Sequence, residues 1–147
     1  ILAAAGVKRL GLVKGSPQGL LVDGLYALQL AQPGWLPAVG QGALGIEGRA
    51  EDDHVVHLLA PLHDAATFAE TAAERAFLHG LGVGCQAPVA GLAQSSEGST
   101  LRLVGRVLSN DGQTMVEDKA QGHIDNPVEL GEAVAHACLK LGADALL

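Results

Sequence analysis

The sequence predicts an α+β fold, with a helix, three antiparallel strands and a second helix over residues 65–147. Residues 65–81 and 127–141 carry apolar side chains at the spacing of amphipathic helices. In residues 101–109, the side chains alternate with a period of two, as in a β-strand, so that Arg102 and Arg106 share one face. The turn residues at 110–112, Asn-Asp-Gly, tolerate positive φ and form the strongest hairpin signal in the chain.

The first 35 residues contain one clear element. Residues 1–11 predict a short helix with a basic last turn and Gly11 at its end. Residues 14–19 form a turn cluster, and residues 20–31 fit either a helix or a strand. Periodicity alone therefore leaves the second part of this segment undecided.

Residues 36–49 form a glycine-rich segment whose backbone can approach another group closely. A short apolar strand is expected around residues 44–46. An acidic triplet at 51–53 then predicts the start of a helix. Its expected buried face combines four residues at helical spacing: Val55, Leu58, Leu59 and Leu62.

The helix at 65–81 is expected to begin with a capping box formed by Thr67 and Glu70. The following strands are predicted at 88–93, 101–109 and 113–120. The last helix is expected to begin at Asn126, with Pro127 in its first position. The apolar stripe of the first helix consists of Ala69, Ala73, Ala76, Phe77, Gly80 and Leu81, and the predicted buried face of the last helix consists of Leu130, Val134, Ala137, Cys138 and Leu141.

Composition excludes several classes of function. The chain has 147 residues, of which 48% are hydrophobic and 17% charged, as in a globular protein. Nine basic and sixteen acidic residues give a net charge of −7, which argues against a nucleic-acid surface. No apolar run approaches the ~20 residues of a membrane span. Two cysteines make no disulfide framework, so a cytoplasmic setting is expected.

The chain begins Ile-Leu-Ala-Ala-Ala, without an initiator methionine. This start is typical of a piece of a larger fold. Apolar residues of the first 50 positions, such as Leu10, Leu44 and Ile46, are then expected to pack on domains outside this sequence.

Cys85 is the main candidate for chemistry, because its flanking glycines favour exposure of the thiol. A buried turn cysteine is the alternative. No Lys or Arg lies within nine residues, and the preceding helix C-terminus disfavours a thiolate, so this thiol is weakly activated. Cys138 lies on an apolar helix stripe and is expected to be a core residue.

Other polar groups are weaker candidates. His54 and His57 are spaced as helical zinc ligands can be, but they share the face opposite the apolar stripe, so no metal site is expected. Arg102 and Arg106 share one strand face, where solvation is the simpler explanation than anion binding.

Three motifs together resemble the porphobilinogen deaminase (hydroxymethylbilane synthase) family. They are LPAVGQGALGIEGR at 36–49, AERAFL at 73–78 and GVGCQAPVAG at 82–91, in this order. The chain departs from the family at Val83, where a glycine is usual, and at Gly48, where a second cysteine is common. Residues 13–35 have no clear match.

The resemblance implies a longer enzyme of three domains, in which a sheet with helices on one face follows two α/β domains like those of periplasmic binding proteins. Residues 1–35 would end domain 2, residues 36–57 would cross back to domain 1, and residues 58–147 would form the C-terminal cofactor-attachment domain. The catalytic residues of the family would lie in the N-terminal half, which this chain lacks, so the chain alone is expected to be inactive.

The resemblance also implies a chemistry. Cys85 would carry a covalent dipyrromethane cofactor through a thioether, on which four porphobilinogen units are joined into linear hydroxymethylbilane with loss of ammonia. Residues expected in the cleft are Gln41, Gly42, Ala43, Arg49 and Arg75. The intact enzyme would be a cytoplasmic monomer acting on a small molecule, with no nucleic-acid or membrane partner. Two alternatives are a stand-alone tetrapyrrole- or partner-binding domain without catalysis and a cysteine-dependent hydrolase.

Overall fold

The computed structural model describes residues 3–12, 20–22, 25–30, 34–96 and 98–147. The chain divides into two units, residues 1–36 and 37–147. Each unit is considered by itself.

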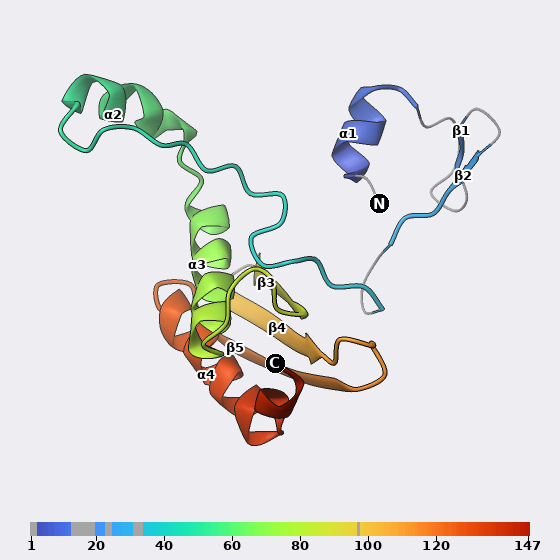
Figure 1. Ribbon diagram of the computed structural model, residues 1–147. Coiled ribbons are helices and arrows are strands. Elements are labelled where there is room, and N and C mark those ends of the chain that lie inside the picture. Colours follow the sequence, from blue (N-terminus) through green and yellow to red (C-terminus); the bar gives the residue numbers. More distant parts are fainter. Residues whose placement is uncertain (1–2, 13–19, 23–24, 31–33, 97) are drawn as a thin grey trace. The chain divides into compact units, whose positions relative to one another are not determined.

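The first unit contains a short helix and a two-stranded ribbon (Figure 1). Helix α1 spans Ala4–Arg9 and ends before Gly11, whose φ is +63°, so the predicted helix and its stop are confirmed. Strands β1 (Leu20–Val22) and β2 (Leu25–Ala27) pair antiparallel, so the undecided segment contains strands rather than a helix. The predicted turn cluster at 14–19 lies outside the described residues.

The second unit is built on one three-stranded antiparallel sheet in the order β3-β4-β5, with α3 and α4 packed on the same face (Figure 1). The predicted α+β class and the helices on one face are confirmed. The elements in chain order are α2 (Asp53–Leu59), the 3-10 turn η1 (Ala60–Leu62), α3 (Ala65–Gly80), β3 (Val89–Ser96), β4 (Thr100–Leu108), β5 (Met115–His123), α4 (Pro127–Lys140) and the 3-10 turn η2 (Ala143–Leu146).

The core lies between the helices and the sheet, and β4 supplies its centre. Leu101, Leu103 and Val107 alternate toward the helices and are fully buried, as period-2 alternation predicts. Phe77 of α3 lies against two glycines that face each other across the β3–β4 ladder, Gly91 and Gly105. This glycine pair makes room for the aromatic ring of Phe77. The ring thereby fixes α3 over β3 and β4 at this point.

The hairpin between β4 and β5 is also as predicted. The Gly112 N–H donates to the Ser109 carbonyl at 2.8 Å, and the Ser109 N–H donates to the Thr114 carbonyl at 2.9 Å. Gly112 has a φ of +69°, the conformation for which glycine suits this turn. The Ser109 hydroxyl, at 2.6 Å, is the main cause that lowers the pKa of Asp111.

Two predictions about the middle of the chain are wrong. Residues 44–46 form no strand, and Leu44 is 94% exposed, because no other strand in the described part of the chain lies beside them. The helix predicted after the acidic triplet is present as α2, but none of its residues is buried and Leu58 is 63% exposed. Two residues of its expected buried face, Val55 and Leu59, approach Gly48 in the preceding loop.

The helix termini also differ from expectation. The cap of α3 is Asp64, whose carboxylate accepts the Thr67 N–H at 2.8 Å, so the predicted capping box is wrong. Glu70 instead accepts hydrogen bonds from Ser95 on β3. Asn126 precedes α4 as predicted, but its side chain makes no capping hydrogen bond.

The α4 stripe is shifted relative to the prediction. Leu141 follows the end of the helix and is 61% exposed, so its predicted burial is wrong. Gly131 and Ala135 are buried in its place, because α4 packs closely on α3 through small residues. None of the described helices is long and apolar enough to span a membrane.

Candidate functional site

Cys85 lies in the turn that connects α3 to β3. The Ala87 N–H donates to the Gly84 carbonyl at 3.1 Å, which places Cys85 at the first central position of a four-residue turn. The residue is exposed and its thiol is free, so the predicted exposure is confirmed and the buried alternative is not. An exposed thiol at the tip of a turn can accept a bulky covalent substituent without disturbing the core.

The turn is anchored on both sides of the thiol. Leu81 is buried at the end of α3, Gly82 turns the chain with a φ of +71°, and Val83 packs against the core. Val83, which departs from the family pattern, thus fastens the segment that leads to Cys85. After the turn, the Leu108 N–H donates to the Pro88 carbonyl at 2.9 Å and joins it to β4.

Cys138 differs from Cys85 in burial. It is fully buried on α4, and its sulfur lies 3.9 Å from the Gly105 carbonyl oxygen. Burial raises the pKa of the Cys138 thiol and thereby keeps it protonated. Its predicted core role is confirmed.

Gln41, Gly42 and Ala43 lie in a loop of consecutive tight turns. The Gln41 N–H donates to the Ala38 carbonyl at 3.0 Å, and the Ala43 N–H donates to the Gly40 carbonyl at 3.3 Å. Gly40 and Gly42 have φ values of +73° and +93°, which disfavour residues with a side chain. The loop therefore depends on its glycines, as the sequence suggests.

This loop is fastened to the two elements that flank Cys85. The Gly91 N–H on β3 donates to the Pro37 carbonyl at 3.1 Å, and Val39 packs against the core. The Gly40 N–H donates to Glu74 Oε2 at 2.6 Å, while Glu74 Oε1 accepts the Ala93 N–H at 2.8 Å. One carboxylate on α3 thus joins the loop to β3.

Glu74 was missed by the sequence analysis. Its side chain is only 5% exposed, and burial, the largest cause, raises its pKa. The two backbone hydrogen bonds oppose this shift, whereas the neighbouring Glu70 charge adds to it. Glu74 lies three positions before Phe77 and seven before Leu81, so an acidic residue on the apolar stripe was the signal that could have revealed it.

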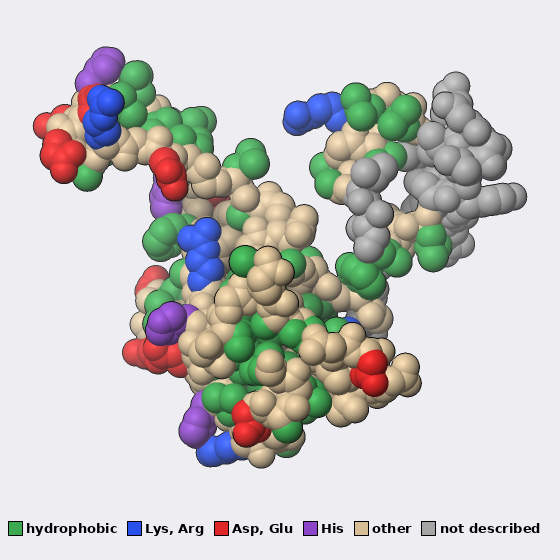
Figure 2. Space-filling view, viewed as in Figure 1, with side chains coloured by type: hydrophobic (Ala, Val, Ile, Leu, Met, Phe, Trp, Pro, Cys, Tyr) green, Lys and Arg blue, Asp and Glu red, His purple; other side chains and the backbone are tan. Residues whose placement is uncertain are grey.

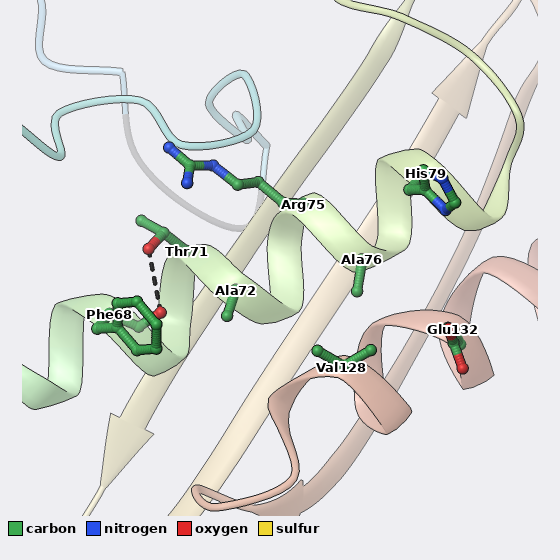
Figure 3. A pocket seen from close by; sticks show the side chains of 8 residues that line it. All are labelled: Phe68, Thr71, Ala72, Arg75, Ala76, His79, Val128 and Glu132. Atoms are coloured by element: carbon green, nitrogen blue, oxygen red, sulfur yellow. Dashed lines mark hydrogen bonds between the residues drawn. The ribbon is translucent and has the colours of Figure 1, made fainter. Parts of the chain in front are cut away.

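The two arginines expected in the cleft are both exposed. Arg75 follows Glu74 on α3 and borders a groove of about 360 Å³ between α3 and α4. Figure 3 shows Arg75 extending away from Ala76 and Val128, which line the groove. Arg49 precedes α2, and no hydrogen bond among the described residues ties its side chain to the other predicted site residues.

Acidic and histidine side chains gather over α2 (Figure 2). Within the described ranges, however, no three His, Cys, Asp or Glu side chains are close enough to hold a metal ion. The His57 ring lies 3.2 Å from the carbonyl oxygen of Asp53, one turn earlier on the same helix. This contact is local to α2.

Two family models match the chain. Residues 68–140 match the porphobilinogen deaminase C-terminal domain, and residues 1–57 match the model described as the porphobilinogen deaminase dipyromethane cofactor binding domain. The chain belongs to the porphobilinogen deaminase family. The C-terminal match includes most of α3, the Cys85 turn, the sheet and α4.

Similar proteins include porphobilinogen deaminases of Roseiflexus sp. (strain RS-1), 45% identical, and Roseiflexus castenholzii, 46% identical, over all 147 residues. The deaminase of Bacillus velezensis is 42% identical over the same length. The chain spans 45%, 45% and 44% of these relatives, respectively, which is less than half their length. These matches support the deaminase interpretation and do not support a stand-alone binding domain.

Proposed function

We propose that this chain is the C-terminal part of a hydroxymethylbilane synthase. The whole enzyme would join four porphobilinogen units into linear hydroxymethylbilane with release of ammonia. A dipyrromethane bound through a thioether at Cys85 would supply the primer for this growth. The observation that carries the proposal is the exposed Cys85 thiol at the tip of an anchored turn, in a chain of this family.

Each predicted residue has a defined part in this proposal. Cys85 would hold the primer, and the turns of Gln41, Gly42 and Ala43 would present backbone groups to the pyrroles. Arg49 and Arg75 would help to hold the cleft or the growing chain, which the exposure of both side chains supports. The catalytic residues would lie in the N-terminal half of the whole protein.

We also propose the domain assignment of residues 1–35 to the end of domain 2, 36–57 to the crossover and 58–147 to the cofactor-attachment domain. A monomeric enzyme in the cytoplasm, with porphobilinogen as its small-molecule partner, follows from the family resemblance.

The test is intact-mass spectrometry on a chimeric enzyme that joins the N-terminal part of the Roseiflexus sp. (strain RS-1) relative to this chain. We expect turnover of porphobilinogen and a mass increment of two pyrrole units. Cys85→Ala should abolish both, while the matched Cys138→Ala variant should keep the increment. An increment that persists in Cys85→Ala would overturn the assignment of the thiol.

A further inference from the structure

We propose that Glu74 is a positioning residue, whose carboxylate holds the glycine loop of residues 40–43 in a fixed position relative to β3. This inference rests on the proposed function, because it gives that loop a role in the cleft. It concerns a residue that touches neither cofactor nor substrate in the proposal and acts through the backbone of the loop.

The first argument is the edge of the sheet. One edge of β3 pairs with β4, so its outer N–H groups need other acceptors. The acceptors are the Pro37 carbonyl for Gly91, Glu74 Oε1 for Ala93 and Glu70 Oε1 for Ser95. Two glutamates one turn apart on α3 therefore occupy this edge together with the loop.

The two glutamates use their oxygens differently. Glu70 takes both the N–H and the hydroxyl of Ser95 on one oxygen, Oε1, each at 2.7 Å. Glu74 uses both oxygens, one for the Ala93 N–H on β3 and the other for the Gly40 N–H in the loop. Glu74 is thus the glutamate that connects two separate backbone segments.

The Gly40 contact is well placed to control the loop. It joins residues 34 positions apart in the chain, with an N–O distance of 2.6 Å. Gly40 also starts the turn closed by the Ala43 N–H. The orientation of Gln41 and Gly42 therefore depends on where Glu74 holds the Gly40 amide.

The structural test compares amide hydrogen exchange in the 147-residue chain and two variants. In Glu74→Gln, the side-chain amide can accept only one of the two N–H groups. The buried strand amide of Ala93 should retain the oxygen, so exchange at Gly40 should rise roughly tenfold or more. In the matched Glu70→Gln control, a single amide oxygen can still accept both Ser95 groups, and exchange at Gly40 should not change.

Core amides such as those of Leu103 and Val134 report whether each variant is folded. Equal protection of Gly40 in the wild type and in folded Glu74→Gln would overturn the proposal. The wild type provides a measurement that does not depend on variant folding. If its Gly40 amide exchanges as fast as an unstructured glycine, the proposal is also overturned.

The functional test uses the chimeric enzyme, loaded with cofactor and active. Glu74→Gln should lower kcat per folded molecule roughly ten- to hundredfold through misplacement of the loop, with the Cys85 mass increment retained. Glu70→Gln should keep the wild-type kcat. Unchanged kcat in Glu74→Gln would overturn the positioning role, whereas absence of turnover and increment in the unmodified chimera would count against the proposed function instead.

Discussion

At the scale of the residue, two carboxylates, the N-cap Asp64 that precedes α3 and Glu74 within it, show how position sets the pH dependence of a contribution to stability. Asp64 is exposed at the N-terminus, and the Thr67 backbone N–H is the main cause that lowers its pKa from the ordinary 3.8. Its stabilisation is present above pH 3.8 and is lost as the pH falls through the lower folded-state pKa. Burial raises the pKa of Glu74, so its contribution has the opposite pH dependence. That stability is lost as the pH rises from the ordinary 4.5 through the raised folded-state pKa.

The Asp64 cap gives a pH-dependent prediction. Asp64→Ala should lower the Tm at pH 7, because it removes the acceptor for the Thr67 N–H at the start of α3. The difference from the wild type should shrink below pH 3.8, as the carboxylate of the wild type becomes protonated. Thermal unfolding by circular dichroism at several pH values measures this. Glu47→Ala, which removes one carboxylate from a segment without regular structure, is the control, and an equal response of both variants would contradict the prediction.

Residue-level features were predictable from sequence where they are local. The glycines of the hairpin and the exposure of Cys85 follow from neighbouring residues alone. Glu74 depends on contacts with Gly40 and Ala93, 34 and 19 positions away. Spacing along a helix indicates that a charged residue lies on its inner face, but it does not indicate which distant N–H groups will meet it.

At the scale of the element, α3 and α4 pack closely because small residues face each other. A Cβ at Gly131 would overlap the Ala73 carbonyl oxygen, and a Cβ at Gly80 would lie 2.7 Å from that of Ala135. Gly131→Ala should gain about 1 kcal/mol of helix propensity. Overpacking against backbone atoms should cost more, for a net destabilisation of about 1–2 kcal/mol.

Chemical denaturation of Gly131→Ala measures this net effect. Gly6→Ala in α1 is the matched control, because it is also a helical glycine and no atom outside its own helix lies within 4 Å of the added Cβ. It should leave the unfolding midpoint unchanged or raise it. A more stable Gly131→Ala would show that α3 and α4 can separate without cost.

Elements were predicted well where their packing partners lie in the described part of the chain. The stripes of α3 and α4 and the alternation of β4 indicated the faces that meet in the core. For α2 and residues 44–46, periodicity identified apolar residues correctly but not what covers them. An apolar pattern indicates which face of an element favours burial. It does not indicate which other element packs against that face.

At the scale of the whole molecule, we expect the C-terminal unit to be stable in a chain that has no activity by itself. The core joins α3, α4 and the sheet, and residues 37–40 are tied to it by Pro37, Val39 and Gly40. Helix α1 has six residues, none of them buried, and helices this short are marginal in water. We therefore expect slow amide exchange in the sheet, α3 and α4, and fast exchange in α1.

The 147-residue chain alone should therefore fold its C-terminal unit and yet form no hydroxymethylbilane from porphobilinogen. Positioning and proton transfer supply much of an enzyme's rate, and in the proposed enzyme the groups for those steps would lie in the N-terminal half. A net charge of −7 with nine basic residues also makes this chain alone a poor host for a ligand with many carboxylates. The measurement is product formation by the purified chain, with the chimeric enzyme as the positive control. Turnover by the chain alone would show that its own residues suffice for the reaction, and would require the catalytic groups to be sought among them.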